Sequence, residues 1–234
     1  MNTDAAMHDG WIAYRGAQRD IFATGCADRS IMLSELANAG ALHGLGPCEH
    51  LDGEITLLHG RPYVSKVRNG GCVIEHGFDH GAIFLVWTQH DRWLDVPVPA
   101  AVASYPELQA WLREAAQAHD VDPSHAFPFL LSGVVARLNW HINVDRTDGE
   151  AITRELFQKS KQSYVLTDET VEILGFYSER HHGIFIGEYA PALDLARGEK
   201  NCMHIHFVSA SGQTSGHIDD LRLDGRVTLR LPAR

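Results

Sequence analysis

Alternation of apolar and polar residues predicts β-strands along most of the chain. The segment 54–67 alternates on both sides of His59-Gly60, which indicates a β-hairpin with its turn at those two residues. A run of apolar residues opens 81–90, and 127–144 has the pattern of strands interrupted at Ser132-Gly133. The remaining strands are expected in the second half of the chain, at 170–178, 183–190, 203–209, 217–224 and 226–231.

Helical periodicity is clear in one segment, 105–120. Leu108, Leu112 and Ala115 recur there at helical spacing, charged residues occupy the other face, and Pro106 suits the first turn. Two segments have weaker helical patterns, and one glycine-rich segment is expected to be a connection. These are a short helix at 28–40, a helical or mixed segment at 154–167, and the connection at 42–54.

Strands outnumber helices, and the helices do not alternate regularly with them. This predicts an α+β fold that is β-rich, with mixed or antiparallel sheets rather than a doubly wound sheet. The length of 234 residues fits one large domain or two small ones. The polar stretch DRTDGEA suggests a boundary, so we expect two closely packed subdomains. They are an N-terminal α/β subdomain with a mixed sheet at 1–148 and a C-terminal β-rich subdomain at 149–234.

The net charge of the chain limits the classes of molecule that it is expected to bind. The net charge is −10, with no basic cluster, so we expect no nucleic acid partner, whereas a metal cation or a small polar substrate is compatible. No apolar run reaches about 18 residues, so no membrane span is expected. The N-terminus lacks the features of a secretory signal, and the four cysteines form no CxxC pair. The sequence therefore predicts a cytoplasmic protein whose cysteines are small buried hydrophobic residues.

Three histidines lie close together in MHIHFVSASGQTSGHIDD, residues 203–220. Side chains alternate faces along a strand, so His204 and His206 share one face while their apolar neighbours share the other. A turn centred on Ser211-Gly212 places His217 across from His206, with Cβ atoms about 4.5–5.5 Å apart. Three imidazoles are therefore expected to converge on one point.

Converging imidazoles indicate a catalytic metal site. Three protein nitrogens and one open position are typical of catalytic zinc, whereas structural zinc has four protein ligands. The same register sets Asp219 opposite His204, where it could accept the far ring N–H of that histidine. Cys202 lies on the histidine face as an alternative fourth ligand, and a hairpin with solvated histidines is the alternative without metal. Three imidazoles suit zinc and, to varying degrees, other divalent transition metals.

The histidine segment also resembles part of a known family. HIHF and the SGH after it resemble the HxHF…GGH signature of acetolactate decarboxylases. Upstream, ELANAGALHGLGPCEHLDGEITLLHGRPY (35–63) resembles the family segment ELxxxGDFGLGTFxxLDGExxxxxGxxY, and GIFIGEYAP (183–191) resembles GTxVGFxxP. The matches come in the family's order and span roughly residues 31–225.

The resemblance implies a two-domain α/β fold with a metal between the domains. It implies an enzyme that converts 2-acetolactate, a small hydroxy-keto acid, to acetoin and carbon dioxide, and it suggests a homodimer. His204, His206 and His217 would hold zinc as a Lewis acid. Glu54, in LDGE, would handle a proton beside the metal.

Some family features are replaced in this sequence. Alignment on Gly133 puts His141 where the family has an arginine for the substrate carboxylate, and Arg137 lies four residues earlier. Both are candidate catalytic residues, although histidine cannot grip a carboxylate with two hydrogen bonds as arginine does. We find no equivalent of the family's C-terminal glutamate, and GALHGLGP in place of GDFGLGT puts His43 near the presumed site.

Three functions are compatible with these patterns. The first is a zinc-dependent carbon–carbon lyase of the acetolactate decarboxylase type. The second uses the same three-histidine metal for another decarboxylation, an isomerisation, a hydrolysis or a ring closure on a bulkier substrate of specialised metabolism. The third is a non-catalytic metal- or ligand-binding module, which a closed site with four ligands would favour.

Overall fold

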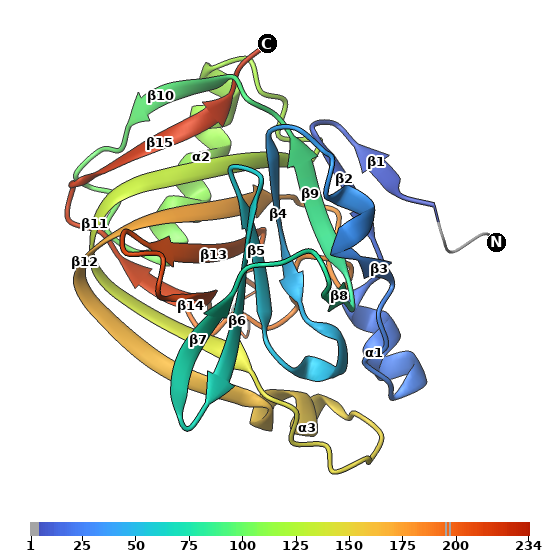
Figure 1. The fold of residues 1–234 in the computed structure, drawn as a ribbon. Coiled ribbons are helices and arrows are strands. Elements are labelled where there is room, and N and C mark those ends of the chain that lie inside the picture. Colours follow the sequence, from blue (N-terminus) through green and yellow to red (C-terminus); the bar gives the residue numbers. More distant parts are fainter. Residues whose placement is uncertain (1–4, 195, 197) are drawn as a thin grey trace.

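Two antiparallel sheets pack against each other and make up most of the molecule (Figure 1). The computed structural model describes residues 5–194, 196 and 198–234. The first sheet has seven strands in the order β1-β2-β9-β4-β5-β6-β7. In chain order these are β1 (Met7–Asp9), β2 (Ile12–Arg15), β4 (Leu42–Pro47), β5 (Glu54–Leu58), β6 (Arg61–Arg68), β7 (Gly71–Glu75) and β9 (Leu85–Gln89).

The second sheet has six strands in the order β10-β15-β11-β12-β13-β14, and a further pairing joins β11 to β14. They are β10 (Trp93–Pro97), β11 (Phe127–Asn143), β12 (Lys161–Tyr177), β13 (Met203–Ser209), β14 (Ser215–Arg222) and β15 (Val227–Pro232). Strands β11, β12, β13 and β14 form a closed circuit of hydrogen-bonded neighbours. The long, bent hairpin of β11 and β12 spans the molecule (Figure 1).

Helices are few, and they cover the sheets rather than connect parallel strands. The α-helices are α1 (Gln18–Thr24), α2 (Tyr105–Ala118) and α3 (Arg154–Lys159), and the 3-10 helices are η1 (Leu33–Leu36) and η2 (Glu49–Leu51). A small two-stranded sheet pairs β3 (Ile31–Met32) with β8 (Gly81–Ala82). Within the described residues, no helix combines the length and the apolar character that a membrane span requires.

Apolar residues from both sheets meet in one cluster, which holds the sheets against each other. Leu45 of β4 and Val86 of β9 belong to this cluster together with Leu174 and Phe176 of β12 and Val208 of β13. Burial of such side chains stabilises the folded state by about 1.5–3 kcal/mol each. The face of β13 that lies toward β5 is therefore enclosed, and the three histidines project from this region.

Several predicted elements are confirmed. The hairpin at 54–67 is formed by β5 and β6, and its turn residues His59 and Gly60 have positive φ angles of 51° and 77°. Two such residues are typical of the tight turn that matches strand twist. The helix expected at 105–120 is α2, with Leu108 and Leu112 fully buried. The β-rich α+β class with antiparallel sheets is also confirmed.

The glycine-rich segment 42–54 was expected to be a connection, and this is wrong for its first half. Residues 42–47 form β4, a fully buried strand at the centre of the first sheet. A Cβ atom on Gly46 would lie 2.1 Å from the carbonyl oxygen of Phe84. The glycines therefore allow neighbouring segments to pack closely. A strand of this kind has the amino-acid composition of a loop, although it is not one.

Three other expectations are corrected. The segment 28–40 holds only β3 and η1, because β3 pairs with β8 and the Glu35 carboxylate accepts the Met32 N–H at 3.0 Å. The segment 127–144 is one continuous strand, in which Gly133 accommodates the bend with a φ of 145°. The segment 183–190 consists of turns rather than a strand.

The expected division at residue 148 falls in the connection between β11 and β12. These two strands pair along most of their length. The strands of the first sheet all lie before residue 90, and those of the second sheet lie after residue 92. The division into subdomains 1–148 and 149–234 stays a prediction.

Candidate metal centre

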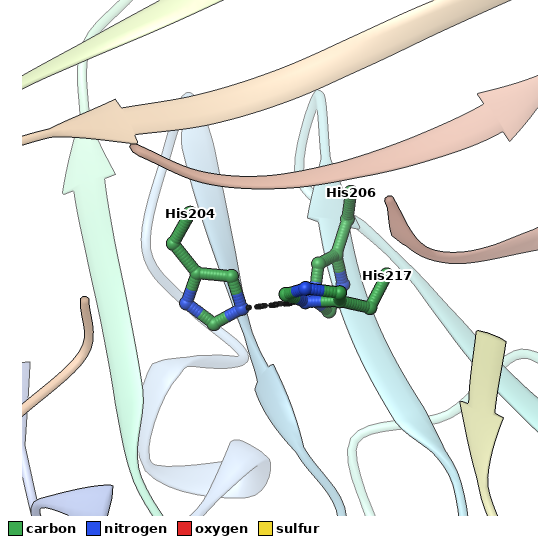
Figure 2. A group of neighbouring side chains, drawn as sticks. All are labelled: His204, His206 and His217. Carbon is green, nitrogen blue, oxygen red and sulfur yellow. Dashed lines mark hydrogen bonds between the residues drawn. The ribbon is translucent and has the colours of Figure 1, made fainter. Parts of the chain in front are cut away.

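The three histidines of 203–220 point toward one another (Figure 2). His206 of β13 pairs directly with His217 of β14, which confirms the predicted register. The Nε2 atom of His204 lies 3.1 Å from Nδ1 of His217 and 3.2 Å from Nε2 of His206. The ligand atoms of all three lie within 4.8 Å of one another. Period-two alternation and cross-strand pairing therefore bring three ring nitrogens to one point.

This cluster fits a tetrahedral metal ion. Metal–nitrogen bonds of about 2.0–2.1 Å at tetrahedral angles separate the nitrogens by about 3.3 Å, close to the distances observed. Burial lowers the pKa of His204 to about 3, and burial followed by the neighbouring histidines holds the pKa of His206 well below its usual range. The rings are therefore neutral at physiological pH, which is the form that binds a metal.

Polar residues behind the cluster fix the orientation of His206. Its Nδ1 lies 3.1 Å from the Thr56 hydroxyl on β5, which in turn accepts a hydrogen bond of 3.1 Å from the Ser215 hydroxyl. Thr56 Oγ1 has two acceptor sites, so it can accept from Ser215 and also from an N–H at His206 Nδ1. That tautomer leaves the Nε2 lone pair directed into the cluster.

Glu54, the first residue of β5, lies beside the cluster. One carboxylate oxygen is 3.7 Å from Nε2 of His206, and the other is 3.8 Å from Nε2 of His141. The side chain is 3% exposed, and burial raises the pKa of its carboxyl to about 8. Burial therefore favours the protonated form of this carboxyl, which is the form that can donate a proton.

His141 of β11 forms a pair with Asp219 of β14. Its Nδ1–H donates to Oδ2 of Asp219 at 2.7 Å, and its ring centroid lies 4.6 Å from that of His217. The predicted contact between Asp219 and His204 is wrong. The β13–β14 ladder ends at His206–His217, and a register shift against β11 leaves Asp219 out of the ladder, so its carboxylate reaches His141 instead.

Lys161, the first residue of β12, supplies a cation to this region. Its side chain is 15% exposed, and its Nζ lies 3.8 Å from Oδ1 of Asp219, longer than an ordinary hydrogen bond. The ammonium also lies 5.9 Å from the ring centroid of Phe157 and 5.7 Å from that of Tyr189. Burial lowers the pKa of Lys161, while Asp219 and then Glu54 act to raise it.

These groups line one pocket. It has a volume of about 60 Å³, which is room for a few water molecules. The polar lining includes Glu54, His141, Lys161, His204, His217 and Asp219. The apolar lining includes Phe84, Phe157, Phe185, Met203 and Ile218. The pocket thus combines a candidate metal centre, a proton donor and a cation within apolar walls.

The sequence matches the family described as alpha-acetolactate decarboxylase over residues 14–232. The chain belongs to this family. Membership agrees with the site, because the family uses a metal and the three histidines form a cluster that could hold one. Comparison with curated proteins gives no match.

Solved structures of the family share the fold. Acetolactate decarboxylase from Bacillus subtilis subspecies spizizenii has a TM-score of 0.73 at 16% identity, with 95% of this chain and 86% of that chain covered. Alpha-acetolactate decarboxylase from Bacillus subtilis strain 168 has a TM-score of 0.70, with the same identity and coverage. A Staphylococcus aureus protein of unknown function similar to alpha-acetolactate decarboxylase has a TM-score of 0.69 at 16% identity, over 93% and 83% of the two chains.

Some residues singled out in the sequence lie away from the pocket. Arg137 is exposed, and its Nε donates to Asn139 Oδ1 at 3.1 Å. His43 packs against the rings of His59 and Trp93, with centroids 4.9 and 5.4 Å away. The Cys202 thiol donates to the Lys200 carbonyl at 3.8 Å and lies outside the histidine group. None of these side chains is part of the pocket lining among the described residues.

Sequence reasoning missed Lys161 and Thr56. Lys161 lies in the polar stretch QKSKQSY, where a solvated lysine is the ordinary expectation. Nothing in its sequence context distinguishes Thr56 from any other threonine in a strand. The alternation of side chains along β5 offered one signal. Glu54 and Thr56 lie on the same face of the strand, so a functional role for Glu54 suggests that Thr56 faces the site as well.

Proposed function

We propose that the protein is a metal-dependent carbon–carbon lyase that decarboxylates a 2-hydroxy-3-oxo acid, with 2-acetolactate as the reference substrate. The observation that carries this proposal is the buried cluster of three converging histidine nitrogens beside the buried carboxyl of Glu54. Membership of the alpha-acetolactate decarboxylase family supports it. The products from 2-acetolactate would be acetoin and carbon dioxide.

His204, His206 and His217 would hold the metal, with zinc as the expected ion. When bound, the ion supplies a Lewis acid that polarises the oxygens of the substrate. The three nitrogens belong to neighbouring strands that are hydrogen-bonded to each other, so the cluster is built on a rigid part of the fold.

Lys161 would bind the substrate carboxylate. Its ammonium faces the pocket, and its nearest anionic partner, Asp219, lies 3.8 Å away and is already hydrogen-bonded to His141. An ammonium has three N–H donors, so capacity is left for a carboxylate oxygen. Lys161 would therefore take the role that the sequence suggested for Arg137, whose side chain is exposed.

Glu54 would supply the proton that completes the reaction. The bond between the carboxylate and C2 breaks, carbon dioxide leaves, and the electron pair flows into the neighbouring ketone. A proton then adds to C2, and Glu54, whose buried carboxyl lies 3.7 Å from Nε2 of His206, would donate it. The carboxyl regains its proton from solvent before the next turnover.

His141 would be a positioning residue. Its Nδ1–H donates to Asp219, which leaves Nε2 with a lone pair facing Oε1 of Glu54 at 3.8 Å. The ring therefore occupies the space beside the carboxyl and fixes its orientation within the pocket. The apolar walls exclude water, which strengthens each of these interactions.

The first test measures metal content and acetoin formation on the same preparation, for wild type and for His206→Ala. We expect about one metal ion per chain and acetoin release from 2-acetolactate in the wild type, and loss of both in the variant. His119→Ala, which removes an exposed histidine at the end of α2, is the matched control and should retain both. Circular dichroism verifies that all three proteins are folded.

Two results would contradict the proposal. Metal bound at full occupancy with no acetoin would exclude 2-acetolactate as the substrate. A folded wild type that binds no divalent metal would exclude the metal centre. The homodimer, the cytoplasmic location and the role in biosynthesis stay predictions.

A further inference from the structure

An open groove with a volume of about 550 Å³ lies beside the pocket. Ser163 of β12 lines it, whereas the neighbouring Tyr164 ring, which stacks on Trp140 with centroids 4.6 Å apart, points to the opposite face of the strand. Val165 of the same strand and Tyr189, from the segment before β13, also line it and are 56% and 57% exposed. The groove therefore offers aromatic and aliphatic surface to a ligand.

The groove is continuous with the pocket of the metal centre. Five residues line both, and they are Gln158, Lys161, Tyr189, Pro191 and Asp219. Lys161 marks the junction, since its ammonium lies 5.7 Å from the Tyr189 ring and 3.8 Å from Asp219. A ligand held by its carboxylate at Lys161 would have one end in the pocket and the other in the groove.

The chemistry of the groove favours an apolar occupant. Only five large hydrophobic residues are exposed within the described part of the chain, and two of them, Val165 and Tyr189, lie here. An apolar group of a ligand would cover these two side chains and remove their surface from water. Lys161 and Asp219, its charged members, lie at the junction with the pocket.

We propose that the groove binds an apolar substituent of the substrate, aromatic or branched aliphatic, that is larger than the methyl groups of 2-acetolactate. The preferred substrate is then a 2-hydroxy-3-oxo acid whose acyl part carries that substituent. This inference rests on the proposed function, because it assumes that the carboxylate and the hydroxy-keto unit occupy the pocket.

Binding of non-reactive analogues tests the groove separately from catalysis. The probes are 2,3-dihydroxy-2-methylbutanoate, in which an alcohol replaces the ketone, and its derivative with a phenyl group on C4. Neither can decarboxylate by the proposed route. Isothermal titration calorimetry on metal-loaded protein would compare wild type with Val165→Asp, in the groove, and with Val73→Asp. Val73 is the matched control, because it is a 43% exposed strand valine outside the groove.

We expect wild type to bind the phenyl analogue about tenfold more tightly than the small one, since burial of an aromatic ring contributes at least this much. Val165→Asp should reduce that advantage to less than about threefold and leave the small analogue unaffected. Val73→Asp should retain the full advantage. A second groove variant, Tyr189→Ala, should weaken binding of the phenyl analogue more than binding of the small one.

Equal affinity of wild type for the two analogues would overturn the inference, as would an advantage that survives in both groove variants. In those cases binding of the small analogue still supports the proposed function. If wild type binds neither analogue, the proposed function itself is contradicted, and the inference that rests on it is overturned too.

Discussion

Glu54 and Lys161 face the same pocket, and burial acts on their charges in opposite ways. It raises the pKa of the Glu54 carboxyl to about 8 and lowers the pKa of the Lys161 ammonium. Each group also favours the charged form of the other, and Asp219 favours the charged form of the lysine. Burial thus favours the neutral form of each group, and the attraction between them favours the charged forms.

Glu54→Gln tests the proton donor. Glutamine keeps the size of the side chain and removes the acidic proton, so turnover should fall by about 10²–10⁴-fold while the fold and the metal content are retained. Steady-state kinetics on 2-acetolactate, together with metal analysis of the same sample, would measure this. Turnover within about threefold of wild type would show that another group supplies the proton.

Lys161→Met tests the carboxylate site. The substitution removes the charge and keeps an unbranched side chain, so KM should rise by at least about tenfold while metal content stays unchanged. Lys161→Arg should restore most of the affinity, because it restores the cation. Lys159→Met is the matched control, since this lysine is 66% exposed and pairs with Glu155 on its own helix. An unchanged KM in Lys161→Met would remove the lysine from the substrate site.

At the scale of elements, the site depends on where strands pair and where pairing stops. β13 and β14 bring His206 opposite His217 because their side chains alternate with a period of two residues. The register shift in β14 then releases Asp219 toward His141. A regular ladder would have kept this carboxylate in register, so the shift decides which histidine it supports.

The central strand β4 depends on close approach of backbone. A Cβ on residue 46 would lie 2.1 Å from the carbonyl oxygen of Phe84, and backbone cannot move aside cheaply. Gly46→Ala should therefore lower the free energy of unfolding by about 1–3 kcal/mol, as overpacking does in cores. Gly40→Ala is the control, because nothing lies within 4 Å of its Cβ position, and its change should stay within about 0.5 kcal/mol. Chemical denaturation of both variants would measure this, and equal stability would contradict it.

At the scale of the whole molecule, charged contacts supplement the apolar cluster between the two sheets. Asp9 of β1 accepts hydrogen bonds from the His125 ring at 2.6 Å and from the Ala126 N–H at 3.2 Å, just before β11. Arg180 and His181, which follow β12, lie 3.2 and 3.8 Å from the same carboxylate. One acidic side chain thus ties the N-terminal hairpin to the second half of the chain.

The contribution of Asp9 should depend on pH. Burial alone would raise its pKa, but the hydrogen bonds from His125 and Ala126, with the charge of Arg180, hold the pKa below the ordinary 3.8. A carboxyl with a lowered folded pKa stabilises the protein above its unfolded pKa and loses this effect as the pH falls through the folded value. Asp9→Asn should therefore cost about 1–2 kcal/mol at pH 7, and the difference should shrink as the pH falls below 3.8. Thermal unfolding of both proteins from pH 7 to pH 3 measures this, and a constant difference would contradict it.

Local pattern was enough to predict those features that depend on neighbours in the chain. The turn at His59-Gly60, the helix α2 and the pairing of His206 with His217 follow from periodicity and turn chemistry. The strand β4 was not predicted from the sequence, because a glycine-rich segment is typical of a loop. The place of Lys161 in the pocket was not predicted either, because a lysine in a polar stretch shows no sign of burial in the sequence.

The sequence by itself determined the β-rich class, the histidine hairpin and the resemblance that places Glu54 near it. The first two follow because alternation along a strand and the geometry of a short turn act over a few residues, whereas the place of Glu54 is implied by the resemblance alone. Only the tertiary structure decided that Lys161 rather than Arg137 faces the pocket, and that Asp219 supports His141. The physical reason is that these choices depend on which distant strands meet and how each is bent, and such long-range contacts leave no periodic signal in the chain.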